Sequence, residues 1–359
     1  MEIVARFEIG FTRYLSPNGD VRSPLPAFAK DPATLVALYR GMVLNRVFDA
    51  KVIALQRTGR LGTCASSLGQ EAVAIGVASA MQREDVLLPT FREQGAMLWR
   101  GVTPLELLLY WGGDERGSDF QGPRSDFPIC VPVGSHAPHA VGVALAFKLR
   151  RDRCAAVCVL GDGGTSKGDF YEAANLAGVW TLPVVFVINN NQWAISVPRA
   201  RQSAAATLAQ KAIAAGIAGE QVDGNDVIAV RDAVGRALAR AHNCDGATVI
   251  EALTYRLSDH TTADDARHYR DDKEVSERWK EEPIARLRLH LTNLGAWNKE
   301  SEERTLAECS AEIDKAVDAY LALPPPPPSA MFDHLYAALP AALEPQRLAV
   351  SSADVETHG

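Results

Sequence analysis

Several features that assign a protein to a class are absent from this sequence. Its 359 residues hold fewer Lys and Arg (37) than Asp and Glu (44), and the formal net charge is −7. A basic nucleic-acid footprint is therefore missing. No apolar run approaches the roughly 20 residues that cross a bilayer. The first residues contain no basic region followed by an apolar signal core. We predict a cytoplasmic protein with neither nucleic acid nor membrane among its partners.

Cysteine is scarce and lacks metal-binding spacing. No pair of the six cysteines forms a C-x-x-C motif, and two of them lie within or beside an apolar, strand-like run. We therefore expect reduced, buried thiols rather than a zinc site or a disulfide framework. The six are Cys64, Cys130, Cys154, Cys158, Cys244 and Cys309.

The middle of the chain contains short, continuous apolar segments rich in β-branched residues. "AAVCVLG" (155–161) and "LPVVFVIN" (182–189) flank a helix-like stretch, and "ATVIEALTYR" (247–256) follows later. Continuous apolar strands separated by helices are typical of a parallel sheet that is covered on both faces. The sequence thus predicts an α/β fold with a doubly wound parallel sheet and helices on both faces.

Helical patterns extend this core at both ends. Asp31-Pro32 opens a predicted helix with Leu35, Leu38, Tyr39 and Met42 on one face. Residues 66–81 predict a second helix rich in small residues, and Ile313, Val317, Tyr320 and Leu321 mark a late one. We divide the chain into an N-terminal extension and helix (1–60), an α/β core (61–270), C-terminal helices (271–323), and a polyproline spacer with a tail (324–359).

A glycine-rich turn, "GDGGTSKG" (161–168), follows the first of these strands. It is not a nucleoside-triphosphate loop, because Lys167 is followed by glycine, nor a dinucleotide loop, because Ser166 stands where a glycine is needed. Asp162 lies at the end of this strand and Asn191 at the end of the next. Ligands of open α/β sheets bind at the carboxyl ends of strands. These two oxygen donors therefore suggest a Mg²⁺-bridged diphosphate.

A glycine-aspartate-glycine turn followed after a helix by Asn-Asn resembles the thiamine diphosphate-binding motif. The stretch from Gly161 to Ser196 resembles the alpha subunit of the decarboxylating component of 2-oxo acid dehydrogenase complexes. "GQEAVAIGVASAM" (69–81), "LLPTFREQGAMLWRG" (87–101) and "TYRLSDHTTADDARHYR" (254–270) extend the resemblance over most of the chain. The resemblance implies the thiamine diphosphate-binding fold, with helical extensions at both ends.

The resemblance also assigns roles to individual residues. It implies that Asp162, Asn191 and the backbone carbonyl of Trp193 bind Mg²⁺, and that His260 is the active-site histidine of a mobile loop. The residues implied to contact the cofactor are Phe91, Arg92, Val131, Val133, Gly163 and Gly164, with His260. Arg92 suits this role chemically, because a guanidinium pairs with phosphate oxygens. We further expect Arg267 and Arg270 to gather with His260 around the diphosphate.

The sequence departs from the family in two places. Ala65 stands where some relatives have histidine, and the potassium-binding pattern of some relatives is only partly present at residues 130–136. We infer neither feature for this chain.

The implied activity is the oxidative decarboxylation of a 2-oxo acid with thiamine diphosphate and Mg²⁺, followed by acyl transfer to a lipoyl group of the acyltransferase core. A beta subunit would complete the site in an α₂β₂ heterotetramer. Pyruvate is the expected substrate, with branched-chain 2-oxo acids and acetoin as alternatives. A non-catalytic structural paralogue and a nucleotide-dependent dehydrogenase remain as hypotheses from other classes.

Overall fold

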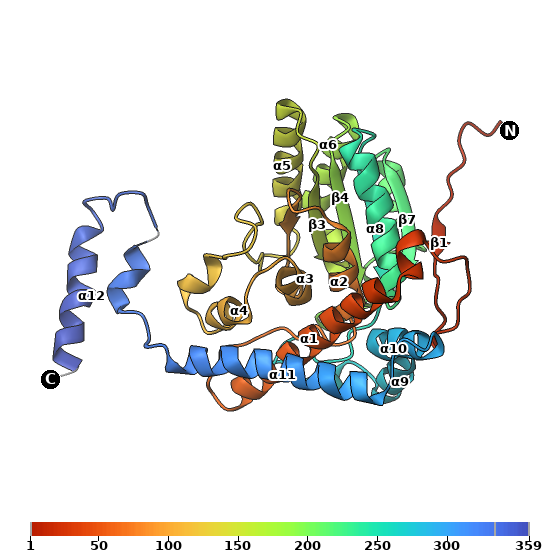
Figure 1. The fold of residues 1–359 in the computed structure, drawn as a ribbon. Coiled ribbons are helices and arrows are strands. Elements are labelled where there is room, and N and C mark those ends of the chain that lie inside the picture. Colours follow the sequence, from red (N-terminus) through yellow and green to blue (C-terminus); the bar gives the residue numbers. More distant parts are fainter. Residues whose placement is uncertain (1, 334, 358–359) are drawn as a thin grey trace.

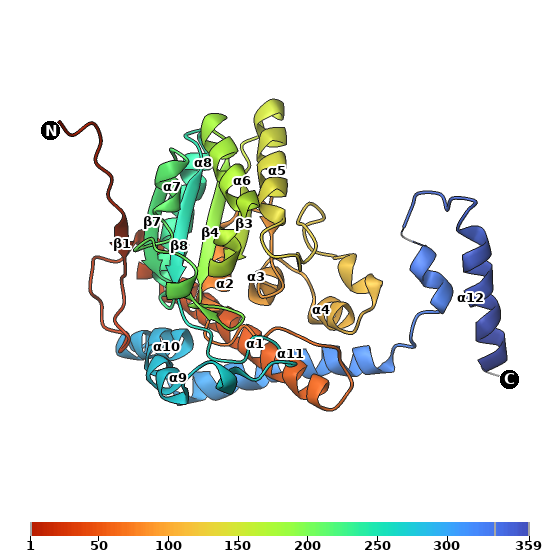
Figure 2. The same ribbon diagram turned by 180° about the vertical axis from the view of Figure 1, so that it is seen from behind.

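The computed structural model describes residues 2–333 and 335–357 (Figures 1 and 2). Its centre is a six-stranded sheet in the order β1-β7-β8-β4-β3-β2, and every neighbouring pair is parallel. The strands are β1 (Gly10–Thr12), β2 (Val86–Leu88), β3 (Ala156–Gly161), β4 (Val184–Asn190), β7 (Ala218–Asp223) and β8 (Thr248–Leu253). The predicted doubly wound α/β fold is confirmed, as are the three predicted strands.

Helices cover both faces of this sheet, which explains the continuous apolar runs. Val157 and Val159 of β3 pack into one core, under α2 (Glu71–Ala80) and α8 (Val227–His242). Ala156 and Cys158 of the same strand pack into the other core, under α5 (His136–Arg150) and α6 (Gly168–Val179). Figure 1 shows the two helical layers on either side of the strands. Because alternate residues enter different cores, neither set can be polar.

The first long helix, α1 (Pro32–Arg57), begins as predicted. The Asp31 carboxylate accepts hydrogen bonds from the backbone N–H groups of Ala33 (3.1 Å) and Thr34 (3.2 Å), which satisfies N–H groups that have no partner within the helix. The predicted small-residue helix begins later than expected, at Glu71. Residues 66–70 form an irregular turn instead, because Ser66 Oγ and Ser67 N both donate to the buried Asp49 (2.6 and 2.8 Å).

The remaining helices pack at the ends and around the rim of the core. They are α3 (Gln94–Trp99), α4 (Pro104–Trp111), α7 (Lys211–Ala214), α9 (Asp272–Arg278), α10 (Pro283–Asn293), α11 (Lys299–Ala322) and α12 (Glu344–Thr357). Ile313 and Val317 of α11 are buried as predicted, whereas Leu321 is 42% exposed, so the apolar stripe ends a turn early. The polyproline segment leads to α12, which stands apart from the rest of the molecule (Figures 1 and 2).

The six cysteines are all unpaired thiols, as predicted. Cys64, Cys158 and Cys309 are buried, but Cys244 is exposed, so the expectation of burial holds for only part of the set. No helix among the described residues combines the length and the hydrophobicity that a membrane crossing needs.

A close crossing of α2 and α8 fixes the position of α2 on the sheet. A Cβ atom added at Gly76 would lie 2.6 Å from Val230 Cγ1. The two helix backbones can therefore approach this closely only because position 76 has no side chain.

We predict that Gly76→Ala destabilises the fold by about 1–3 kcal/mol, because overpacking outweighs the gain of roughly 1 kcal/mol in helix propensity. Gly142→Ala in α5 is the matched control, since nothing lies within 4 Å of an added Cβ there. It should be neutral or stabilising. Urea unfolding of both variants measures the difference. Equal stability of the two would show that the crossing is not tight.

Candidate active site

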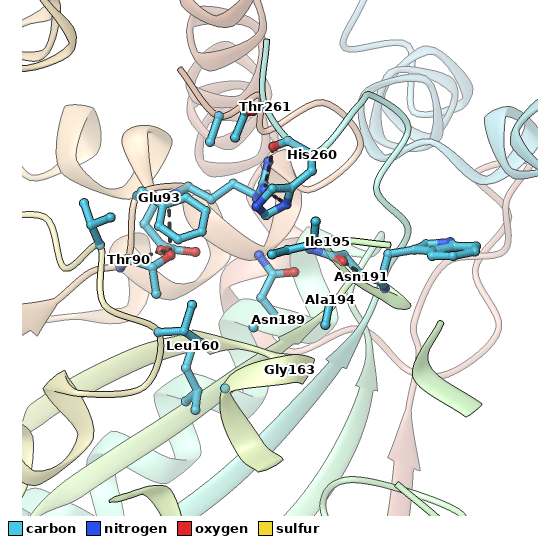
Figure 3. Close-up of a pocket in the computed structure, with 18 of the residues that line it drawn as sticks. Thr90, Glu93, Leu160, Gly163, Asn189, Asn191, Ala194, Ile195, His260 and Thr261 are labelled. Atoms are coloured by element: carbon cyan, nitrogen blue, oxygen red, sulfur yellow. Dashed lines mark hydrogen bonds between the residues drawn. The ribbon is translucent and has the colours of Figure 1, made fainter. Parts of the chain in front are cut away.

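A cavity of about 600 Å³ lies at the carboxyl ends of β2, β3, β4 and β8 (Figure 3). The structure brings to its wall every residue that the sequence analysis assigned to metal or cofactor binding, apart from Arg267 and Arg270. They are Phe91, Arg92, Val131, Val133, Asp162, Gly163, Gly164, Asn191, Trp193 and His260. They come from five separate chain segments, each of which follows a strand or leads into a helix. The parallel sheet is what collects them.

Asp162 is one of two buried carboxylates that line the cavity, and Glu93 is the other. Asp162 is 2% exposed, and burial raises its pKa. Its Oδ2 accepts a hydrogen bond from Gln202 Nε2 (2.8 Å), which opposes that rise. Because this hydrogen-bond donor is uncharged, the buried carboxylate lacks a positively charged partner and is suited to binding a cation.

Asn191 presents its side-chain oxygen in a defined orientation. The backbone N–H of Trp193 donates to Asn191 Oδ1 (3.2 Å), and Asn191 Nδ2 donates to Gln70 Oε1 (2.9 Å). Because a backbone N–H can only donate, the oxygen must lie on the side of Trp193. Asn191 therefore offers an oxygen, rather than a nitrogen, beside the Trp193 segment.

The segment after Asn191 is held in an unusual backbone conformation. Gln192 has φ = +73° and Ile195 has φ = +55°. A β-branched residue at positive φ is a true outlier that the surroundings must enforce. Arg256 supplies this constraint, since its Nη2 donates to the Ile195 carbonyl (2.8 Å) and its Nη1 lies 3.5 Å from the Trp193 carbonyl.

The glycine turn leaves its backbone open to a ligand. A Cβ at Gly163 would lie 2.6 Å from Ala194 Cβ, and one at Gly134 would lie 3.3 Å from the Gly164 carbonyl. Gly134 also has φ = +77°. Behind the turn, the buried Lys211 donates to the Thr165 carbonyl (2.5 Å). A side chain at Gly163 is thus excluded, and the buried Lys211 anchors the turn.

Arg92 is a buried cation that faces the cavity. Its guanidinium donates to the backbone carbonyl of Ser66, and its Nη2 donates to the His260 carbonyl (3.0 Å) and to His260 Nδ1 (3.2 Å). Burial and the nearby charge of Arg256 lower its pKa to about 10, so it remains charged at neutral pH. All three acceptors are uncharged, and the site is therefore suited to an anion.

His260 is held between two guanidinium groups. Arg92 Nη2 and Arg256 Nη1 lie 3.2 and 3.3 Å from its Nδ1. An arginine can only donate, so Nδ1 must be the unprotonated nitrogen and Nε2 carries the proton. Burial and the charges of Arg92 and Arg256 lower the pKa of His260 to about 4. The ring is therefore a neutral N–H donor at neutral pH, not a group that titrates there.

Arg267 and Arg270, which were expected to gather with His260 around a bound diphosphate, do not contact His260 in this structure. Arg267 is directed into solvent and pairs with Asp265 (2.7 Å), its side chain being 76% exposed. Arg270 donates to the backbone carbonyl of Arg256 (2.5 Å). Arg256, the fourth residue before His260 and the third after β8, contacts the ring instead. The loop itself is bonded to the core, since Thr262 N donates to the Cys64 carbonyl (3.0 Å).

Sequence reasoning missed three residues that shape the site: Gln70, Gln202 and Arg256. Arg256 carried a partial signal, because it is the last residue of the predicted strand 247–256. Gln70 and Gln202 carried none, since each reaches its partner from a distant part of the chain.

These features fit a metal-bridged diphosphate. Asp162 and Asn191 supply two hard oxygen donors at adjacent strand ends, and the Trp193 carbonyl lies in the same segment. Among the described residues, no three His, Cys, Asp or Glu side chains form a metal cluster. A cation here would thus need additional oxygens, which Mg²⁺ usually takes from phosphate and water. Arg92 and the open glycine turn suit the phosphate itself.

Comparison with known proteins identifies the family of the chain. Residues 39–329 match the family described as "Dehydrogenase E1 component". The chain belongs to this family. It is 41% identical over 315 residues to the 3-methyl-2-oxobutanoate dehydrogenase subunit alpha of Mycobacterium tuberculosis, covering 88% of this chain and 86% of the relative.

Two pyruvate dehydrogenase E1 component alpha subunits show a similar sequence identity to this chain. That of Acholeplasma laidlawii is 43% identical over 291 residues, covering 80% of this chain and 84% of its own. That of Bacillus subtilis is 39% identical over 336 residues, covering 92% and 90%. The predicted resemblance to the alpha subunit is thereby confirmed.

The lowered pKa of His260 predicts a pH effect on stability. An unfolded histidine binds a proton below about pH 6.5, whereas His260 in the folded chain does so only near pH 4. Between these values the unfolded state binds more protons, so the free energy of unfolding falls as pH falls. We predict that His260→Gln removes part of this loss. Urea unfolding of both proteins at pH 7.5, 5.5 and 4.5 measures it, and parallel pH profiles would contradict the assignment.

Proposed function

We propose that this chain is the alpha subunit of a 2-oxo acid dehydrogenase E1 component, with pyruvate as substrate, thiamine diphosphate and Mg²⁺ as cofactors, and the lipoyl group of an acyltransferase core as acyl acceptor. The observation that carries the proposal is the meeting of Asp162, Asn191 and Arg92 at one sheet edge, in a member of this family. A cytoplasmic location follows from the same proposal.

Each residue has a defined task in this proposal. Asp162 Oδ1, Asn191 Oδ1 and the Trp193 carbonyl hold Mg²⁺. The backbone of Gly163 and Gly164 approaches the diphosphate, and Arg92 neutralises it, while Phe91 and the backbone at Val131 and Val133 border the rest of the cofactor. When bound, thiamine diphosphate supplies an electron-accepting thiazolium ring for the loss of CO₂.

His260 acts as a hydrogen-bond donor through Nε2. With Nδ1 facing two guanidinium groups, the ring cannot pick up a second proton easily at neutral pH. It therefore stabilises negative charge, on the diphosphate or on a reacting oxygen, without transferring a proton from an imidazolium. The Phe91 ring packs edge-on against it, with ring centroids 6.0 Å apart, which fixes the ring plane.

The choice of pyruvate rests on the relatives. Those of Acholeplasma laidlawii and Bacillus subtilis are named pyruvate dehydrogenases, and the equally similar one of Mycobacterium tuberculosis is named for 3-methyl-2-oxobutanoate. Branched-chain 2-oxo acids are thus the alternative substrate, and acetoin is a third. A non-catalytic paralogue is disfavoured, because the oxygen donors, Arg92 and His260 all remain.

A beta subunit would complete the site in an α₂β₂ heterotetramer. Val131 and Val133 line the cavity, yet their side chains are 55% and 48% exposed. Exposed apolar side chains at the mouth of a cavity are typical of a surface that another protein chain buries.

Asp162→Ala should abolish Mg²⁺-dependent binding of thiamine diphosphate, because the only carboxylate among the proposed ligands is lost. The fold should remain, since Asp162 supports no strand. Asp169→Ala, at the half-exposed start of α6, is the matched control. Calorimetric titration measures both. Unchanged Mg²⁺-dependent affinity in Asp162→Ala would refute the metal site.

Co-expression with the beta chain tests assembly and substrate together. We expect negligible turnover from the isolated chain, a tetramer with its partner, and faster decarboxylation of pyruvate than of 3-methyl-2-oxobutanoate. Light scattering and CO₂ release measure these outcomes. Full turnover by a monomer would contradict the beta requirement, and a preference for the branched acid would replace the substrate.

A further inference from the structure

Gln202 is the side chain that holds the buried Asp162. It follows the short 3₁₀ turn Arg199–Arg201, which carries the chain back over the glycine turn. Its Nε2 donates to Asp162 Oδ2 (2.8 Å) and to the Val197 carbonyl (3.1 Å). The contact joins two segments that are 40 residues apart.

The orientation of the Gln202 amide is fixed by chemistry. Both atoms beside Nε2, a carboxylate oxygen and a backbone carbonyl, are acceptors, so the NH₂ group must face them. The amide oxygen Oε1 must then lie on the opposite side. Within residues 2–333 and 335–357, this oxygen is buried and has no hydrogen-bond partner.

The orphaned oxygen lies against the glycine turn. A Cβ added at Gly163 would be 3.4 Å from Gln202 Oε1. Figure 3 shows Gly163 on the cavity wall, in the region of Ala194 and Asn191. A buried acceptor without a donor is unfavourable, so a donor is expected at this place. Mg²⁺ usually retains water, and a water molecule on a cation is a strong donor.

We propose that Gln202 is a positioning residue for the metal–diphosphate site: Nε2 holds Asp162 Oδ2 so that Oδ1 faces the cation, and Oε1 accepts a hydrogen bond from a water molecule on the cation. This inference rests on the proposed function. It assigns to Gln202 both the orientation of the only carboxylate ligand and the retention of the metal-bound water.

A purely structural role predicts something different. If Gln202 only closed the turn through Val197, its loss would lower stability and leave the intrinsic metal affinity unchanged. Outer-sphere partners of a metal ligand, in contrast, typically change metal affinity by about 10–100-fold.

The test uses the chain co-expressed with its beta subunit, with saturating thiamine diphosphate and Mn²⁺ as a paramagnetic probe for Mg²⁺. Gln202→Met keeps the length of the side chain and removes both amide atoms. Arg201→Met, an exposed residue of the same turn, is the matched control. We expect Mn²⁺ affinity, measured by electron paramagnetic resonance, to fall about 10–100-fold in Gln202→Met only. Metal-free melting temperatures of the two variants report the stability cost of losing the Gln202 contacts separately from the metal affinity.

The outcomes separate the two proposals. If the wild type binds Mn²⁺ tightly and Gln202→Met binds it with an affinity within twofold of the wild type, the role of Gln202 is overturned and the proposed function is not. Absence of Mn²⁺ binding by the wild type overturns the proposed function, and this inference with it. If Gln202→Met does not fold, a crystal structure of the wild-type complex with Mg²⁺ and thiamine diphosphate decides. A metal-bound water within hydrogen-bond distance of Oε1 supports the role, and any other donor there overturns it.

Discussion

Two buried charges of opposite sign, on Asp162 and Arg92, face one cavity without forming an ion pair in the described residues, and the rest of the site depends on keeping them apart. Removing an unpaired charge from water is costly. Each is partly compensated by uncharged groups: Gln202 for Asp162, and two backbone carbonyls for Arg92. A ligand that carries a cation and an anion side by side compensates both. A metal diphosphate is such a ligand.

The scaffold that holds Arg92 extends from the sheet edge to the first long helix. Ser66 accepts from Arg92 through its carbonyl and donates through its hydroxyl to Asp49 of α1 (2.6 Å). Burial raises the pKa of Asp49, and its two serine donors oppose this rise. The late start of α2 is explained by the same contacts, because residues 66 and 67 bond to Asp49 instead of entering the helix. Residues 66–70, which were wrongly predicted as helical, therefore owe their irregular conformation to contacts that also hold Arg92.

The sequence predicted the parts of the molecule that depend on local pattern. β3 and β4 are continuous apolar runs with a polar residue at or just after the end of each, and β8 is largely apolar apart from the buried Glu251. β1 and β2 have only three residues each, and most of β7 is only half-buried, so no pattern distinguished them. Gln202 and Gln70 act over 40 and 121 residues, and no local spacing reports such contacts. Arg267 and Arg270 were chosen for their closeness to His260 in the sequence, yet the 3₁₀ turn Ala266–His268 carries Arg267 outward.

The state of His260 shows why tertiary structure must decide a residue's chemistry. An isolated histidine titrates near neutrality. In His260, the two guanidinium groups beside Nδ1 fix one tautomer. Partial burial and the charges of these groups lower the pKa of the ring to about 4. A bound anion beside Arg92 would oppose part of that positive potential and raise the pKa again. The same arginines therefore couple anion binding to the basicity of the ring, and removing either would weaken that coupling.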